Sequence, residues 1–593
     1  MFFQSATSAS TAVISKCLLL LTVMLFSLIT AGEISAAELP GAATAGGARP
    51  ILDDETGESF VYPNATPIPD AESIEKFEAD VPRMQVRGFR IQGVKKREAL
   101  DITQESIESL VKSQAEKLVA SAGPGGFTIS MFESLTRAIS GYYRLRGFFL
   151  ARAYIPEQTV NDGVVTIVIV EGFLDQIIYR GNSLYSNAQL DNLFKSLVGE
   201  SIFLEDIEQA IFIANDYPGL DAKILFGPGL KPGSAAIQVN AREVASQGFV
   251  SWDNYGTSFT GEERWRGNYR FNNLFGQADK LETNLILTLN PQNSLYYDVS
   301  YAQPVISNDF IASGGLGFNE FDVGGNLADL NISGESTVIN ANLGWIYSRK
   351  RNQRITFSAD LSLKDAKNLF GGSVDSNDSL TVLSGRAAYQ GTSWADSRDF
   401  QQMSVTLSLG LPGFLGSMDS GSDPNSSRRG ETQENAGGDF VKISFDYRRV
   451  HKLPELQSLT FKFSGQSSSD LLTSLEQFSL GGPDSVRAYP VSDALMDTAW
   501  LASVEWRVKA SPDSPQTWLN ELEFMTFFDY ATGSLNDPLR NDIDSVTFSG
   551  FGFGVRINPY QQLHVEAQIA FDLGDPPSEN QTLPFYFSLH YDF

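Results

Sequence analysis

The sequence predicts an all-β membrane-spanning barrel of about sixteen strands, preceded by two small α+β domains. Three observations predict this fold class. After residue 246 helical spacing disappears, and segments of about ten residues alternate apolar and polar side chains up to residue 593. The turn-rich connections between these segments are alternately long and short. Before residue 246, a pattern of one strand, two amphipathic helices and two further strands occurs twice.

The composition excludes several other classes of protein. The chain has 593 residues, with 44 Lys and Arg against 71 Asp and Glu, and its formal net charge is -27. Because sequence-independent binding of nucleic acid depends on Lys and Arg that neutralise phosphates, we expect no nucleic-acid partner. Beyond the N-terminal region no apolar run approaches the roughly 20 residues of a spanning helix, which excludes a helical membrane protein.

The N-terminus has the pattern of a secretory signal peptide. Lys16 precedes an apolar run at 17–29, and small residues follow at 35–37. We expect residues 1–37 to be removed; an uncleaved anchor is disfavoured because the apolar run is short for a bilayer. Cys17 is the single cysteine, so the mature chain would have no thiol for a disulfide, a zinc site or a nucleophile.

Residues 38–83 are predicted to form a linker, followed by the two repeats at 84–172 and 173–245. The linker is rich in Gly, Pro and Ala, and only residues 70–79 have helical spacing. The first repeat should contain a strand, two helices and a hairpin, at 85–94, 102–118, 130–145, 149–155 and 164–171. The second should have helices over 187–197 and 204–217 and two strands within 222–243.

Residues 246–593 are predicted to form the barrel. Leu281, Leu285 and Leu287 share one face of a segment whose other face is mainly polar, which suits lipid outside and water inside. A soluble sandwich also alternates, so alternation alone does not decide. The strands are expected to be centred near residues 251, 268, 285, 299, 314, 342, 359, 385, 405, 444, 462, 502, 524, 552, 566 and 588.

The lengths of the connections favour the barrel over the sandwich. Connections after odd-numbered strands are long, whereas those after even-numbered strands, such as NLFGQA and SRKRNQ, are short. A membrane barrel has long outer loops and short periplasmic turns, but a sandwich has no reason for this asymmetry. The long connections are expected at 320–334, 365–378, 411–437, 468–496 and 530–546.

Residues Gly141–Gly172 (GYYRLRGFFLARAYIPEQTVNDGVVTIVIVEG) resemble the first of two polypeptide-transport-associated (POTRA) domains of two-partner secretion transporters, the haemolysin secretion/activation family. The spacing from Tyr143 through Gly147 and Pro156 to Glu171-Gly172 carries the resemblance. An α+β module of another periplasmic protein is the alternative. The final aromatic residue, Phe593, resembles the terminal signal of outer-membrane barrels. The resemblance implies a barrel in the outer membrane and two POTRA domains in the periplasm.

Two further motifs match this family. LGGPDSVRAYP, at 480–490, resembles the Val-Arg-Gly-Tyr loop that the family folds into the barrel lumen, and Phe527-Phe528-Asp529 matches its Phe-x-Asp motif. We expect Arg487 to pair with Asp529 in the lumen, because a guanidinium binds a carboxylate bidentately. A solvated loop arginine and an ordinary lumen aspartate are the alternative. The candidate site therefore comprises Val486, Arg487, Ala488 and Tyr489 in the loop and Phe527 and Asp529 on the wall.

One residue of the loop motif departs from the family. Ala488 stands where the family usually has glycine. A left-handed backbone at this position is therefore in doubt, because a Cβ disfavours positive φ.

The resemblance implies export of a large secreted partner exoprotein that the POTRA domains capture. Strand addition to a sheet edge is a plausible mode of capture, because backbone hydrogen bonds accept varied sequences. Ile224, Phe226, Ile237 and Val239 are the candidate edge residues. Other expected partners are outer-membrane lipids and, during biogenesis, the barrel-assembly machinery. The transporter is expected to be a monomer.

No enzyme activity, cofactor or metal is expected. The chain has three histidines, and no HExxH, GxSxG or phosphate-loop motif accompanies them. A passive porin is the alternative from another class, but it would not carry the two repeats. An assembly insertase of the same superfamily is a nearer alternative, and the presence of two repeats rather than three to five favours the secretion transporter.

Overall fold

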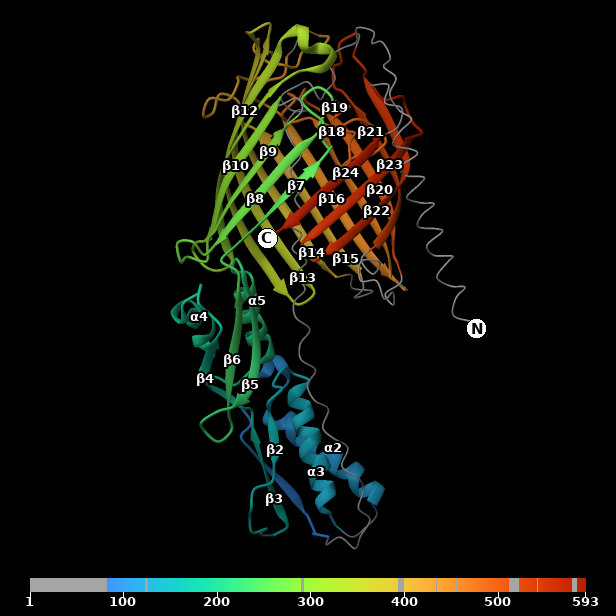
Figure 1. The fold of residues 1–593 in the computed structure, drawn as a ribbon. Coiled ribbons are helices and arrows are strands. Elements are labelled where there is room, and N and C mark those ends of the chain that lie inside the picture. Colours follow the sequence, from blue (N-terminus) through green and yellow to red (C-terminus); the bar gives the residue numbers. More distant parts are fainter. Residues whose placement is uncertain are drawn as a thin grey trace, which may run out of the picture.

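The computed structural model describes residues 83–122, 126–160, 162–289, 293–392, 399–432, 435–454, 456–510, 522–540, 542–578 and 584–593. The predicted signal peptide (1–37) and the linker as far as residue 82, with its helix over 70–79, lie outside the described residues. Figure 1 shows two small modules stacked below a large barrel, with the second module next to the barrel. Within these ranges, no helix is long and apolar enough to cross a membrane.

The first module has the predicted order of one strand, two helices and two strands. Its elements are β1 (Gly88–Gln92), η2 (Glu98–Leu100), α2 (Gln104–Ala122), α3 (Ile129–Arg144), β2 (Arg152–Tyr154) and β3 (Val164–Val170). Helix α3 begins after Thr128, whose side chain accepts a hydrogen bond from the Met131 amide. Its buried residues Met131, Leu135 and Ile139 recur at helical spacing, and Leu135 and Ile139 share a core with residues of the sheet, whose order is β1-β3-β2.

The second module repeats this arrangement. Its elements are β4 (Phe173–Arg180), α4 (Asn187–Phe194), η3 (Lys195–Leu197), α5 (Leu204–Asn215), β5 (Leu220–Pro228) and β6 (Ser234–Glu243). Helix α4 starts with a reciprocal capping box between Ser186 and Gln189. The sheet order is β4-β6-β5, with β4 and β6 parallel and β6 and β5 antiparallel.

The barrel is closed and has sixteen strands, each antiparallel to both neighbours, and each predicted strand centre lies within one of them. Strand β24 pairs with β7 and so completes the ring. The strands are β7 (Ser246–Asp253), β8 (Arg264–Asn272), β9 (Lys280–Thr288), β10 (Ser294–Pro304), β11 (Phe310–Asp322), β12 (Ile332–Lys350), β13 (Gln353–Phe370), β14 (Ser373–Thr392), β15 (Asp399–Gly410), β16 (Val441–Leu453), β17 (Gln457–Ser468), β20 (Thr498–Lys509), β21 (Leu522–Ser534), β22 (Ser545–Tyr560), β23 (Leu563–Asp572) and β24 (Phe585–Asp592).

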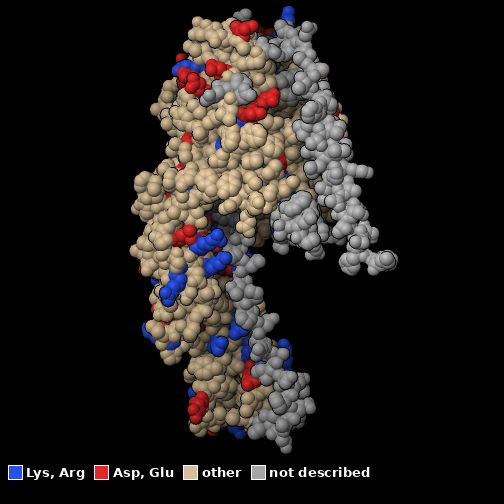
Figure 2. Space-filling model, in the orientation of Figure 1, with Lys and Arg blue, Asp and Glu red and all other residues tan. Residues whose placement is uncertain are grey.

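The two faces of the strands differ as the alternation predicts. Val504 and Trp506 are exposed on the outside of β20, whereas Ser503 and Glu505 are buried inside. Figure 2 shows that on the viewed face the middle of the barrel carries few charged side chains, which gather at the outer loops and on the modules. A belt with few charges and with exposed apolar side chains such as Val504 and Trp506 suits the hydrocarbon of a bilayer.

One predicted long connection is wrong. Residues 365–378, expected to form a loop, continue the ladder of β13 and β14, and the turn between these strands is Gly371-Gly372 alone. Both glycines have positive φ, 58° and 79°, which a two-residue turn of the primed type requires. The polar composition of 365–378 was typical of a loop, but the Gly-Gly pair was a hairpin signal.

The long hairpins project on the outer side of the barrel. Strand β14 has 20 residues, and its residues 373–381 extend beyond the pairing with β15, which begins at Val382. The described part of the connection between β15 and β16 packs against this extension, because Met418 N donates to Ser379 O at 2.7 Å and Asn377 N to Asn425 O at 2.8 Å. The sheet therefore extends further outward at β13 and β14 than at β7 and β24, which have 8 residues each.

Candidate functional site

The connection between β17 and β20, residues 469–497, forms a loop that packs against lumen-facing residues of the barrel; we call it the lumen loop. It contains a short hairpin of β18 (Phe478–Leu480) and β19 (Ala494–Met496). Gly481 and Gly482 follow β18 with φ near +99° and +97°, and a Cβ on Gly481 would lie 2.2 Å from Pro490 O. These glycines turn the chain so that the tip, residues 486–489, is almost fully buried.

Arg487 is held at the tip by two carboxylates of the barrel wall. Its Nε donates to Asp529 Oδ2 at 2.9 Å and its Nη2 to Asp529 Oδ1 at 2.8 Å, a bidentate pair. Nη1 donates to Glu505 Oε2 at 2.6 Å and to Gln568 Oε1 at 3.2 Å. Ser503 Oγ donates to Asp529 Oδ1 at 2.7 Å. The predicted partners therefore meet, and sequence reasoning missed Glu505, Ser503 and Gln568, which lie on β20 and β23.

Aromatic residues complete the contacts of the tip. The guanidinium carbon of Arg487 lies 3.3 Å from the ring centroid of Phe527, and Phe528 points outward and is exposed. Tyr489 stacks on Phe548 of β22 with ring centroids 4.0 Å apart and donates its hydroxyl hydrogen to Asp575 O at 2.8 Å. The tip therefore contacts several neighbouring strands at once.

Ala488 adopts a φ that is not positive. The alanine in place of the usual glycine therefore costs no left-handed strain. Val486 is fully buried in the cluster that holds Ala488 and Tyr489.

A second anchor, which sequence reasoning missed, holds the root of the lumen loop. The side chain of Glu476 is 3% exposed and accepts from Lys364 Nζ of β13 at 2.5 Å and from Lys442 Nζ of β16 at 2.8 Å. Burial by itself raises the pKa of this carboxyl, but the two ammonium groups outweigh it and lower the pKa to about 2. Only the barrel topology brings these three residues together.

The candidate edge residues of the second module fall in two different strands. Ile224 and Phe226 lie on β5, which pairs with β6 alone and is an edge strand, and Phe226 is exposed. The choice of Ile237 and Val239 as edge residues is wrong. They lie on β6, the central strand, and both are fully buried. The α4–α5 connection leads from β4 to β5, and β6 then returns between these two strands, parallel to β4 and antiparallel to β5.

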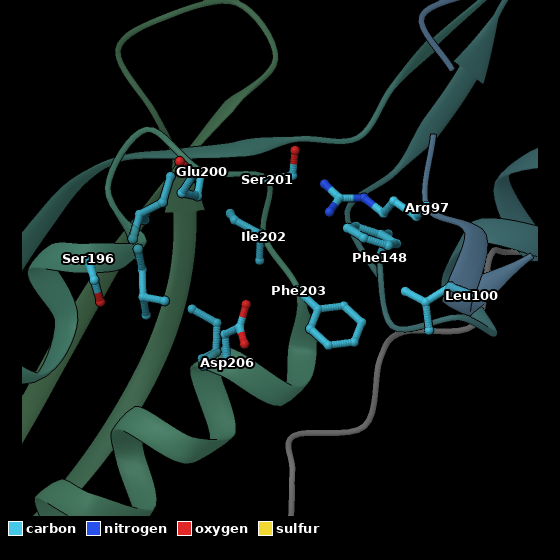
Figure 3. Close-up of a pocket in the computed structure, with 12 residues that line it drawn as sticks. Arg97, Leu100, Phe148, Ser196, Glu200, Ser201, Ile202, Phe203 and Asp206 are labelled. Atoms are coloured by element: carbon cyan, nitrogen blue, oxygen red, sulfur yellow. The ribbon is translucent and has the colours of Figure 1, made fainter. Parts of the chain in front are cut away.

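A cavity of about 220 Å³ lies where the two modules meet. Figure 3 shows Arg97 and Phe148 of the first module facing Phe203 and Asp206 of the second. Burial and the neighbouring Glu205 raise the pKa of the Asp206 carboxyl. The cavity is smaller than the roughly 300–1,000 Å³ typical of ligand sites, and it marks the joint between the modules. Among the described residues, no cluster of three or more His, Cys, Asp or Glu is arranged to hold a metal ion.

The second module is fastened to the periplasmic turns of the barrel. Asp216, at the end of α5, accepts from Arg349 Nε at 2.5 Å and from Arg354 Nη1 at 2.6 Å. Gln209 Nε2 of α5 donates to Arg349 O at 2.7 Å, and Arg349 is buried. This contact fixes the module beside the turn between β12 and β13.

Phe593 lies at the seam between the first and last barrel strands. Its amide donates to Gly248 O at 2.8 Å, and the Gly248 amide donates to Phe593 O at 2.9 Å. The residue is exposed on the outside of the barrel.

A closed sixteen-stranded barrel with two α+β modules at one mouth and an anchored loop in its lumen has the architecture of an outer-membrane protein transporter. The model of the haemolysin secretion/activation protein family ShlB/FhaC/HecB matches residues 233–557, more than half of the chain. The model of the ShlB-type POTRA domain matches residues 100–172. The chain belongs to the haemolysin secretion/activation family and is a two-partner secretion transporter of the outer membrane, with its POTRA domains in the periplasm.

Curated relatives and a solved structure agree with this family. The heme/hemopexin transporter protein HuxB of Haemophilus influenzae strain 86-028NP is 24% identical over 478 residues, 78% of this chain and 81% of the relative. The outer membrane transporter CdiB of Dickeya dadantii is 24% identical over 455 residues, 72% of this chain and 74% of the relative. The structure of CdiB from Escherichia coli has a TM-score of 0.64 at 19% identity and covers 89% of this chain and 93% of that one, which shows a shared fold.

Proposed function

We propose that the lumen loop closes the pore of this transporter at rest and that the Arg487–Asp529 pair keeps the loop in its working position during export of a secreted partner exoprotein. The observation that carries this proposal is the bidentate contact between two residues that are 6% and 1% exposed. Removing one partner of a buried ion pair costs about 3–5 kcal/mol, because the other charge stays buried without compensation. Loop position therefore depends strongly on Arg487.

The test is secretion of the partner by cells that carry Arg487→Ala. We expect secretion to fall while the amount of heat-modifiable barrel in the outer membrane stays close to wild type. Secretion by Arg487→Lys should be intermediate, since an ammonium keeps the charge but not the bidentate geometry of the guanidinium. Arg448→Ala, which removes an exposed arginine of β16, is the matched control. Normal secretion by Arg487→Ala at wild-type abundance refutes the proposal.

The second module is proposed to capture the unfolded exoprotein by strand addition to the free edge of β5. An edge strand offers unpaired backbone groups, and exposed apolar side chains beside it select the peptide. Phe226 is 41% exposed on this strand. Phe226→Ala should weaken binding of a labelled exoprotein segment to the full transporter several-fold in fluorescence anisotropy. Leu230→Ala, on the exposed turn after β5, should not, and equal losses in both would argue against this edge.

The remaining expectations on partners and activity belong to the same proposal. The transporter acts as a monomer among outer-membrane lipids, reaches the membrane with the barrel-assembly machinery and has no enzyme activity. Folding of the exoprotein outside the cell supplies direction. Deleting the gene should stop one large secreted protein from reaching the surface while other barrels still assemble, whereas general loss of barrels would support an assembly insertase.

A further inference from the structure

The tip of the lumen loop rests on a strand position that has no side chain. The methyl group of Ala488 is buried against Gly550 of β22, and a Cβ built on Gly550 would lie 2.4 Å from Ala488 Cβ. Carbon atoms pack no closer than about 3.5 Å, so the two positions cannot both carry a methyl group in this arrangement.

Neighbouring residues prevent the tip from moving aside. Tyr489 stacks on Phe548, two residues before Gly550, and Tyr586 donates its hydroxyl hydrogen to Tyr489 O at 2.9 Å. Two residues after it, a Cβ on Gly552 would lie 2.3 Å from the ring of Phe527, the ring under Arg487. Contacts on both sides of Ala488 therefore fix the position of the tip along β22.

We propose that Gly550 is a positioning residue for the lumen loop and that positions 488 and 550 together accommodate one methyl group. In this chain Ala488 of the loop carries the methyl group, in place of the glycine usual in its family, and Gly550 of the barrel wall leaves space for it. Gly550 does not take a positive φ, so its need for glycine comes from this contact rather than from backbone conformation. The inference extends the proposed role of the loop in export.

The experiment compares Gly550→Ala, Ala488→Gly and the double variant in the full transporter. Conductance in planar bilayers reports whether the tip is seated, and secretion reports export. Gly550→Ala should raise the ratio of open to closed time roughly ten-fold, as expected for overpacking of a buried site, and the double variant should return close to wild type. The other near neighbour of the added Cβ, Phe571 O at 3.0 Å, is present in Gly550→Ala and in the double variant alike. The difference in conductance between these two variants therefore reports the contact with Ala488.

Gly344→Ala on β12 is the matched control. This lumen-facing glycine has no atom closer than 3.8 Å to an added Cβ, so its conductance and secretion should not change. Normal conductance of the Gly550→Ala protein would overturn the inference. So would a double variant whose conductance and amount of heat-modifiable barrel are no closer to wild type than those of Gly550→Ala. If Gly550→Ala alters conductance while secretion stays normal, the inference that Gly550 positions the loop is supported. The proposed role of the loop in export would then be refuted.

Discussion

Glu476→Gln should release the root of the lumen loop while leaving its tip contacts in place. In the wild type, Glu476 is buried and its carboxylate accepts from Lys364 and Lys442. The amide is nearly the same size but neutral, and it keeps one acceptor oxygen for two ammonium groups. The two lysine side chains are only 16% and 12% exposed, so water does not replace the lost partner fully.

The size of the effect follows from this burial. Breaking a buried ion pair from one side costs about 3–5 kcal/mol, and retention of one hydrogen bond points to the lower end of this range. About 3 kcal/mol corresponds to a shift of roughly a hundred-fold in the ratio of held to released loop. Replacing all three groups by Met should restore much of the loss, because the cost lies in uncompensated charge rather than in shape.

Single-channel recordings in planar bilayers provide the assay. Glu476→Gln should spend far more time in a high-conductance state than wild type, at equal heat-modifiable mobility. Glu335→Gln is the matched control, since Glu335 pairs with Lys367 at 3.1 Å on exposed ends of β12 and β13. Conductance of Glu476→Gln indistinguishable from that of Glu335→Gln would show that the buried cluster does not hold the loop.

Three further outcomes are expected. The pKa of Glu476 is about 2 in the folded protein against 4.5 ordinarily, so the root anchor should hold from pH 7 down to about 4.5 and weaken as the pH falls toward 2, which conductance against pH would reveal. Asp216→Asn should loosen the second module from Arg349 and speed amide exchange in α5 roughly ten-fold by hydrogen–deuterium exchange mass spectrometry, and unchanged exchange would rule out this fastening. Phe593→Ala should lower heat-modifiable barrel in the outer membrane several-fold although its backbone bonds to Gly248 are kept, whereas wild-type amounts would mean that the ring is not an assembly signal.

The local patterns of the sequence predicted the elements well because each pattern has a local cause. Alternation located the centre of each barrel strand, since each strand has one face to lipid and one to the lumen, but it missed the outer ends of β13 and β14. The helices of both modules followed from buried residues at helical spacing, such as Leu135 and Ile139 in α3. The Arg487–Asp529 contact came from the family motifs, which identified two residues 42 positions apart.

The sequence did not reveal features that depend on which strands are neighbours. Two strands around a Gly/Pro turn are recognisable as a hairpin, but their pattern does not say that β6, with Ile237, lies in the centre of the sheet. Glu476 meets Lys364 and Lys442 across 112 and 34 residues, so no spacing along the chain indicates the cluster. The methyl-sized gap at Gly550 depends on the depth of a loop that only the fold determines.

The outward extension of β13 and β14 makes the outer mouth of the pore asymmetric. A tilted strand crosses a bilayer with about 9–11 residues, so the 20 residues of β14 leave about ten to stand above the membrane, roughly 30 Å of sheet. The seam between β24 and β7 has no such extension. The extended hairpin of β13 and β14 therefore stands on one side of an emerging chain, and we expect the first folded segment of that chain to form on the opposite side, near the seam.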